Sequence, residues 1–170
     1  MNEERTIYWQ TLFIAYMIEK NNIIGIVNEW LEGKDYFLVD VTVSPDDEIV
    51  VEIDHADGVW IEDCVELSRY IESKLNRDEE DFGLEVGSAG IGQPFKVHQQ
   101  YVNHVDKEVE VLAGDGRKYR GILSEATDDT FTVVVNEKVL AEGAKRPKME
   151  PVPHTWRYDE VKYVKAILTF

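Results

Sequence analysis

The stretch VVEIDHADGVWIEDCVELSRYIESKL, residues 50–75, decides the fold of the first half of the chain. Its opening VVEID suits a strand, and DHADG, residues 54–58, supplies turn residues. Apolar or small residues then recur at helical spacing, namely Ile61, Cys64, Ser68, Ile71 and Leu75. The stretch therefore predicts a strand, a turn and a helix of about four turns, whose Cys64 side is buried against a hairpin.

The flanking sequence adds three more elements. Residues 21–31 repeat apolar side chains at three- and four-residue steps, which predicts a short amphipathic helix. DYFLVDVTVS, residues 35–44, alternates with strand period and meets the strand over 49–54 through the turn SPDDE. FGLEV, residues 82–86, follows as a short strand. The order α-β-β-α-β predicts a small two-layer α/β domain, so that we expect an α+β protein.

The second half is a series of short strand patterns. The candidate strands are KEVEVLA, RKYRGILSE, FTVVV, HTWRY and YVKAIL, at residues 107–113, 117–125, 131–135, 154–158 and 163–168. Residues 136–153 are polar and contain three prolines, which fits either a long loop or a frayed extension of a hairpin. Five short strands with tight turns predict a small closed β-barrel, because closure removes exposed sheet edges.

The charge of the chain is strongly acidic and unevenly distributed. The formal net charge is −16; residues 1–98 carry 22 acidic and 7 basic side chains, and residues 99–170 carry 12 and 11. A protein that holds RNA mainly by its phosphates is expected to be basic. The first half should therefore repel nucleic acid and attract basic partners, although an acidic surface also serves solubility.

The single cysteine, Cys64, excludes an intramolecular disulfide and favours a reducing, cytoplasmic setting. No stretch approaches the roughly 18 apolar residues of a membrane span. The apolar segment at residues 7–18 lacks a basic n-region and a cleavage site, so that we expect a soluble protein without a signal peptide.

Three features of the sequence look like functional sites at first, but their residues do not fit the patterns that such sites require. Gly87, Gly90 and Gly92 form neither a dinucleotide fingerprint nor a phosphate loop. The acidic runs at residues 46–48 and 78–81 lack the alternating ligands of a calcium loop and are expected to be solvated turns. Cys64 lies on the apolar stripe of its helix and is expected to be a buried small hydrophobe instead of a nucleophile, and Ser68, one turn further on, has no histidine nearby in sequence. We therefore expect no catalytic residue, no metal site and no cofactor.

Several stretches resemble the RimP family of ribosome maturation factors. Residues 50–75 follow the family's strand, glycine turn and D-D-C-x-x-x-S-R helix, and LEVGSAGIGQPFK, residues 84–96, follows its interdomain junction. EVEVLAGDGRKYRGIL, residues 108–123, looks like the first hairpin of its Sm-like barrel, and residues 156–168 are similar to its last two strands. The resemblance runs from about Met17 to the end.

The resemblance implies an N-terminal α/β domain followed by an Sm-like or SH3-like small barrel. It divides the chain into an extra N-terminal segment over 1–16, the α/β domain over 17–91, a linker over 92–98 and the barrel over 99–170. We also expect Met17 to serve as an alternative start.

The resemblance further implies a non-enzymatic factor that assists maturation of the small (30S) ribosomal subunit. Its implied partners are the immature subunit and ribosomal protein twelve of the small subunit, with contact to ribosomal RNA; we expect a monomer that binds no membrane. The alternative is an Sm-like RNA-binding chaperone or riboregulator. Residues 126–133 and 161–166 lack the asparagine and the Arg-Gly pair with which Sm proteins read uracil, which disfavours a uridine-binding ring.

The junction VGSAGIGQP, residues 86–94, carries three glycines and a proline, which is typical of an interdomain linker. Its candidate site residues are Gly87, Ser88, Ala89, Gly90, Gly92, Gln93 and Pro94. Against the family pattern, Gly87 replaces a serine, Ala89 a proline and Gln93 an arginine. Losing the arginine removes a fixed cation with five donors, so any contact it makes in relatives is absent here.

Another departure from the family pattern lies at the start of the central helix. Trp60 stands where the family usually has a threonine N-cap. Tryptophan has no oxygen with which to cap a helix, so we expect Asp57 or a shifted start to compensate.

The dense basic groups of the second half are the candidate ribosome-binding residues. They are Arg117, Lys118, Arg120, Lys145, Arg146 and Lys148. Two explanations stay open: ordinary strand-edge and loop charge, which prevents edge pairing, and contact with the RNA backbone.

Overall fold

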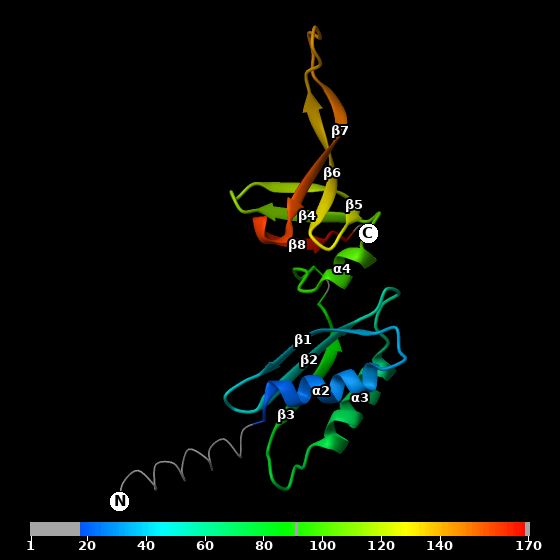
Figure 1. The fold of residues 1–170 in the computed structure, drawn as a ribbon, viewed down its shortest axis with the longest axis vertical. Coiled ribbons are helices and arrows are strands. Elements are labelled where there is room, and N and C mark those ends of the chain that lie inside the picture. The colour runs from blue at the N-terminus through cyan, green and yellow to red at the C-terminus, as the bar shows by residue number, and fades with distance from the viewer. Residues whose placement is uncertain (1–17, 91, 169–170) are drawn as a thin grey trace, which may run out of the picture. The chain divides into compact units, whose positions relative to one another are not determined.

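The computed structural model of the chain describes residues 18–90 and 92–168 and contains two compact units, divided between Ala89 and Gly90 (Figure 1). Each unit holds one β-sheet with helices, which confirms the α+β class. The predicted extra segment over 1–16 and the alternative start at Met17 lie outside the described residues.

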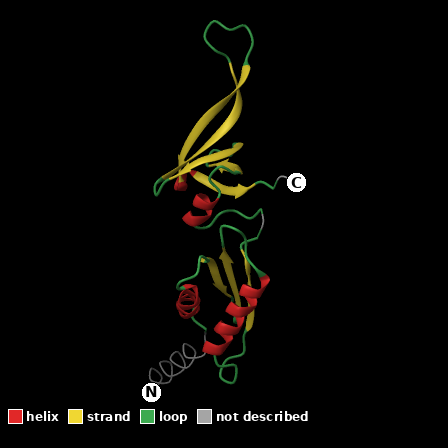
Figure 2. Ribbon diagram, turned by 90° about the vertical axis from the view of Figure 1, so that its right-hand side faces the viewer, coloured by secondary structure: helices red, strands yellow, loops and turns green. Residues whose placement is uncertain are grey.

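Residues 18–89 of the first unit have the predicted order α-β-β-α-β. Their elements are α2 (Lys20–Leu31), β1 (Phe37–Val43), β2 (Glu48–Asp54), α3 (Ile61–Lys74) and β3 (Gly83–Ser88). The sheet order is β1-β2-β3; β1 and β2 form an antiparallel hairpin, whereas β2 and β3 run parallel. Both helices pack on one side of this sheet and contact each other (Figure 2).

The core of the first unit lies between this sheet face and the two helices. The strands bury Val41 and Ile53. In α3 the buried residues are Leu67 and Ile71, while Cys64 is only half-buried and Ile61 is 78% exposed. The predicted stripe was therefore wrong at its start, because Ile61 opens the first turn of the helix and points to solvent, and it missed Leu67.

A tertiary contact takes the place of a side-chain cap on α3. Trp60 is the N-cap residue, and its side chain makes no capping hydrogen bond. The Tyr36 hydroxyl accepts a hydrogen bond from the Trp60 backbone N–H at 3.3 Å and donates one to the carboxylate of Asp63 in the first helical turn. The expected substitute, Asp57, is not the residue that holds this end. Burial, followed by the hydrogen bond to Asp63, raises the pKa of Tyr36.

The predicted linker over 86–94 begins inside the sheet. Val86, Gly87 and Ser88 belong to β3 and continue its parallel pairing with β2, and the N–H of Ala89 donates to the carbonyl of Ile53 at 3.1 Å. The expectation of a linker was wrong for these residues, because an available strand edge satisfies their backbone groups. Beyond the strand, Gly92 has a positive φ of 76°.

The second unit contains one helix and a five-stranded antiparallel sheet. Its elements are α4 (His98–Asn103), β4 (Glu108–Ala113), β5 (Lys118–Ala126), β6 (Thr130–Val139), β7 (Lys148–Arg157), the 3-10 turn η1 (Tyr158–Glu160) and β8 (Val161–Ala166). The sheet order is β7-β6-β5-β4-β8.

The predicted closed barrel is not confirmed. Within residues 92–168 the sheet keeps two edges, β7 and β8, which are not hydrogen-bonded neighbours. The polar stretch over 136–153 is the extension of a hairpin. In that hairpin β6 and β7 pair with each other over ten residues, Thr130–Val139 with Lys148–Arg157, and extend beyond the sheet (Figure 1).

Gly121 lets the sheet of the second unit curl over its core. A Cβ atom at this position would lie 2.1 Å from the carbonyl oxygen of Val134 on β6, which is a backbone atom and has no rotamer to change. The close approach lets β5 and β6 bend around the buried side chains of Leu123, Phe131 and Val164. Glycine is required here because it carries only a hydrogen atom at the place where any other residue carries a Cβ atom.

Helix α4 was not predicted from the sequence. The Gln100 side-chain oxygen accepts hydrogen bonds from the backbone N–H groups of Lys96, at 2.6 Å, and Val97, at 3.1 Å, and so caps the start of the helix. Tyr101 packs on Phe131 with ring centroids 5.3 Å apart, and its burial raises its pKa to about 12. The four-residue spacing of Val97, Tyr101 and Val105 was the available signal.

Two isoleucines of α3 provide a matched test of the core. Ile71 has no exposed surface and Ile61 is 78% exposed. Replacing Ile71 by alanine should lower the free energy of unfolding by about 2–5 kcal/mol, through lost burial and a cavity. Replacing Ile61 by alanine should change it by less than about 0.5 kcal/mol. Urea unfolding of both variants measures the difference, and equal costs would contradict the assignment.

Gly121→Ala tests the curl of the second sheet. The added methyl group meets the Val134 carbonyl, so that the variant should lose about 1–3 kcal/mol or more of stability. Gly25→Ala is the control, because its Cβ would enter open space in the middle of α2 and should stabilise the protein by about 0.5–1 kcal/mol. Thermal unfolding should show opposite signs; a neutral Gly121→Ala would show that the strands can move apart.

Candidate functional site

The six candidate basic residues fall into three places of the second unit. Lys118 and Arg120 lie on β5, within the sheet. Lys145, Arg146 and Lys148 lie at the far end of the β6–β7 hairpin. Arg117 lies in the β4–β5 turn, where its Nε is 3.6 Å from a carboxylate oxygen of Asp115. The structure therefore brings only part of the predicted set together.

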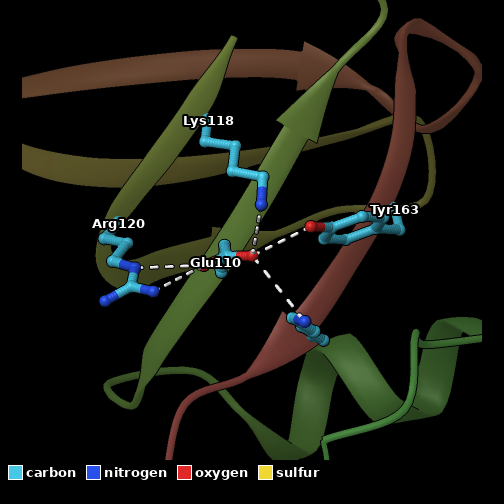
Figure 3. Close-up of polar contacts among 5 residues, drawn as sticks. Glu110, Lys118, Arg120 and Tyr163 are labelled. Carbon is cyan, nitrogen blue, oxygen red and sulfur yellow. Dashed lines mark hydrogen bonds and ion pairs between the residues drawn. The ribbon is translucent and has the colours of Figure 1, made fainter. Parts of the chain in front are cut away.

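The carboxylate of Glu110 organises the cations on the sheet (Figure 3). Glu110 lies on strand β4, between β5 and β8, and is 4% exposed. Arg120 contacts its Oε2 through Nε and Nη2, both at 3.0 Å, and the Tyr163 hydroxyl donates to its Oε1 at 2.9 Å. A buried carboxylate requires such partners, because its desolvation is costly.

Two lysines complete this group from the neighbouring strands. The Nζ atoms of Lys118 on β5 and Lys165 on β8 lie 3.9 Å and 3.7 Å from Oε1 of Glu110. Sequence analysis missed Lys165 and Tyr163, because only the pairing of β4 with β8, opposite Glu110 and Leu112, places them here. We call Glu110, Lys118, Arg120, Tyr163 and Lys165 the Glu110 cluster.

The charge of the Glu110 cluster is positive. The hydrogen bond from Tyr163 lowers the pKa of Glu110, burial opposes this, and Arg120, Lys118 and Lys165 lower it further. The carboxylate is therefore ionised at neutral pH, and three cations surround one anion. The side chains of Arg120 and Lys118 remain 69% and 62% exposed. The cluster thus presents excess positive charge to solvent, which can hold a phosphate or carboxylate.

The end of the β6–β7 hairpin forms a second basic surface. Lys145, Arg146 and Lys148 are exposed, and no ion pair between described residues involves them. Leu140 and Met149, in the same segment, are 62% and 61% exposed. This hairpin tip is a solvated ribbon whose cations are free to meet an anionic partner.

The described residues contain no group of three or more His, Cys, Asp and Glu side chains that could hold a metal ion. An open hollow beside the β5–β6 turn is lined by Asp129, Thr130, Arg157, Tyr158 and Asp159, and its Arg157 already pairs with Asp159 at 3.2 Å. None of the described helices is long and apolar enough to cross a membrane.

The two units differ sharply in charge. Residues 1–89 carry 22 acidic and 6 basic side chains, whereas residues 90–170 carry 12 of each. The whole net charge of −16 therefore belongs to the first unit, and the two basic surfaces belong to the neutral second one.

Comparison with known proteins gives the family. The model of the RimP N-terminal domain matches residues 26–92. A ribosome maturation factor RimP from Porphyromonas gingivalis is 41% identical over 152 residues, which is 89% of this chain and all of the relative. The chain belongs to the RimP family. RimP proteins from Flavobacterium psychrophilum and Christiangramia forsetii are each 32% identical, over 60% and 69% of this chain and 66% and 71% of their own lengths.

The family model places the RimP resemblance on the structure. Its match begins inside α2, covers the whole sheet of the first unit and ends at Gly92, just past β3. The family resemblance drawn from the sequence is thereby confirmed, whereas neither basic surface of the second unit lies within the matched residues.

Glu110→Gln tests the electrostatics of the cluster. Because the folded-state pKa of Glu110 is lowered, its ionisation stabilises the fold above the unfolded pKa, and this contribution is lost as pH falls through the folded pKa. The variant should be less stable than the parent by about 1–2 kcal/mol at pH 7. This gap should close as pH falls below about 4.

Unfolding of both proteins by urea between pH 7 and pH 3 measures this gap. Glu125→Gln, at an exposed position of β5, is the control and should show no gap at any pH. A gap for Glu110→Gln that stays constant with pH would assign the effect to packing instead of charge.

Proposed function

We propose that this protein is a non-enzymatic ribosome maturation factor that binds the immature small (30S) ribosomal subunit. Membership of the RimP family is the observation that carries the proposal, because its relatives bear the name ribosome maturation factor. The arrangement of charge supports it, since a ribosomal subunit offers both RNA phosphates and strongly basic proteins.

The second unit is proposed to contact ribosomal RNA. The Glu110 cluster and the hairpin tip each present exposed cations that can neutralise phosphates. The domain is neutral as a whole, so these contacts would be local and would accompany a protein contact. We also propose that this unit is an Sm-like or SH3-like barrel, which the strand order and the curl at Gly121 support.

The acidic first unit is proposed to face basic protein on the subunit, with ribosomal protein twelve as the expected partner. Its 22 acidic side chains repel phosphates and attract lysine- and arginine-rich surfaces. The junction from Gly90 to Pro94 would let the units adjust on docking, with the positive φ of Gly92 as its most adaptable point.

The alternative is an Sm-like RNA-binding chaperone, which the two basic surfaces of the second unit favour. The affinity for naked RNA separates the two functions. A chaperone should bind naked RNA tightly, with log affinity falling steeply against log salt concentration. An assembly factor should bind small subunits well and naked RNA poorly.

Neutralising the hairpin tip tests the RNA contact. A variant with Lys145, Arg146 and Lys148 all replaced by glutamine should bind immature small subunits more weakly. The slope of log affinity against log salt should flatten by about 0.7–0.9 for each phosphate that the variant no longer neutralises. The melting temperature should stay unchanged, because these side chains make no ion pair within the described chain.

Lys107→Gln and Lys162→Gln form the matched control, since both lysines are exposed in the same unit and lie outside the two basic surfaces. Equal loss of affinity per removed charge in the control would mean that only the overall charge matters. An unchanged salt slope in the triple variant would remove the hairpin tip from the interface.

A further inference from the structure

The start of α3 exposes three apolar side chains in one place. Trp60 is 66% exposed, Ile61 is 78% exposed and Val65 is 42% exposed. Trp60 and Ile61 are consecutive, and Val65 lies four residues after Ile61, which places it on the same face of the helix. They are three exposed apolar side chains within the N-cap and the first two turns of the helix.

Folding does not explain these residues. Trp60 occupies the N-cap without capping, at a position where serine, threonine or aspartate would stabilise the helix. Ile61 and Val65 are β-branched residues on a solvated helix face, where they have below-average helix propensity. Each residue type gains stability when it is buried, and here each one keeps 42% or more of its surface exposed to water.

Acidic side chains lie beside these apolar residues. Glu62 and Glu66 form a second stripe along α3, one position after Ile61 and Val65, and Asp57 lies in the preceding turn. All three carboxylate side chains are exposed. Glu62 and Asp63 also occupy the positive end of the helix dipole, where a phosphate would otherwise find backbone donors. The surroundings therefore favour a cationic partner and disfavour RNA.

The backbone under this surface is held in place before any partner binds. The Tyr36 hydroxyl joins the Trp60 N–H to the Asp63 carboxylate, and the Tyr36 ring packs against His55 with centroids 4.9 Å apart. A fixed base reduces the ordering that binding requires. Tryptophan in such a setting is the residue type that most often dominates an interface.

We propose that Trp60, Ile61 and Val65, with Asp57, Glu62 and Glu66, form a docking surface for a basic protein segment: an apolar anchor flanked by lysine or arginine. We call this surface the α3 patch. The inference rests on the proposed function, and it assigns the protein contact of the acidic unit to a specific place. The apolar anchor covers Trp60 and Ile61, and the flanking cations meet the stripe of carboxylates.

Trp60→Ser separates binding from folding, because the two effects have opposite signs. Serine supplies the missing N-cap oxygen, so that the melting temperature of the full chain should rise or stay unchanged. The affinity for immature small subunits should fall about 30-fold or more, the range of a dominant interface residue. Val102→Ser, at a 40% exposed position of α4, is the matched control and should leave affinity unchanged.

A photo-crosslinking residue placed at Val65 of the full chain identifies the partner. On immature small subunits it should join a subunit protein, at a segment where lysine or arginine flanks an apolar residue. A crosslink to RNA, to a second copy of the chain or to residues 1–17 of the same chain overturns the proposal. The absence of any crosslink overturns it as well.

The outcomes also distinguish this inference from the function on which it rests. If Trp60→Ser binds subunits like the parent while the hairpin-tip variant loses affinity, the α3 patch is refuted and the proposed function stands. If the parent protein does not bind subunits at all, both are refuted.

Discussion

A carboxylate that is almost removed from water needs partners on every side, and Glu110 imposes that requirement on the sheet of the second unit. Its contacts come from the two strands that flank β4: Lys118 and Arg120 lie on β5, and Tyr163 and Lys165 lie on β8. Shifting β5 or β8 by one residue would turn these side chains to the opposite face and leave the charge unpaired. The pairing register and the exposed positive charge therefore have the same cause.

Buried ion pairs of this kind are weak sources of stability, since desolvation offsets much of their attraction. Their value is specificity. In this sheet the apolar core supplies the burial, with Leu123, Phe131 and Val133 fully covered. Glu110 selects the arrangement in which that core and the cations occur together. An apolar residue at this position could pack as well, but it would not hold three cations on one outer surface.

The local pattern of the sequence predicted much of the fold and little of the candidate site. The helices of the first unit and the hairpin β1–β2 follow from periodicity within a few neighbouring residues. Tyr163 and Lys165 could not be found in this way, because they reach Glu110 through a pairing between strands that are 53 residues apart. The prediction of a linker from Val86 to Ser88 was wrong for a similar reason. The glycine in this stretch suggests a loop, but pairing with the neighbouring strand β2 makes it part of β3.

The contrast between local pattern and distant contacts also explains Trp60. Judged from its neighbours in sequence it is unfavourable, because it has no oxygen with which to cap the start of the helix. In the structure Tyr36, 24 residues earlier, holds that helix end through Asp63 and the backbone, so that the helix start does not depend on a capping side chain at position 60. A large aromatic residue that the fold does not need and does not bury has a cost in water. An exposed aromatic residue is best tolerated where a binding partner covers it, and the neighbouring carboxylates indicate that this partner is a basic protein.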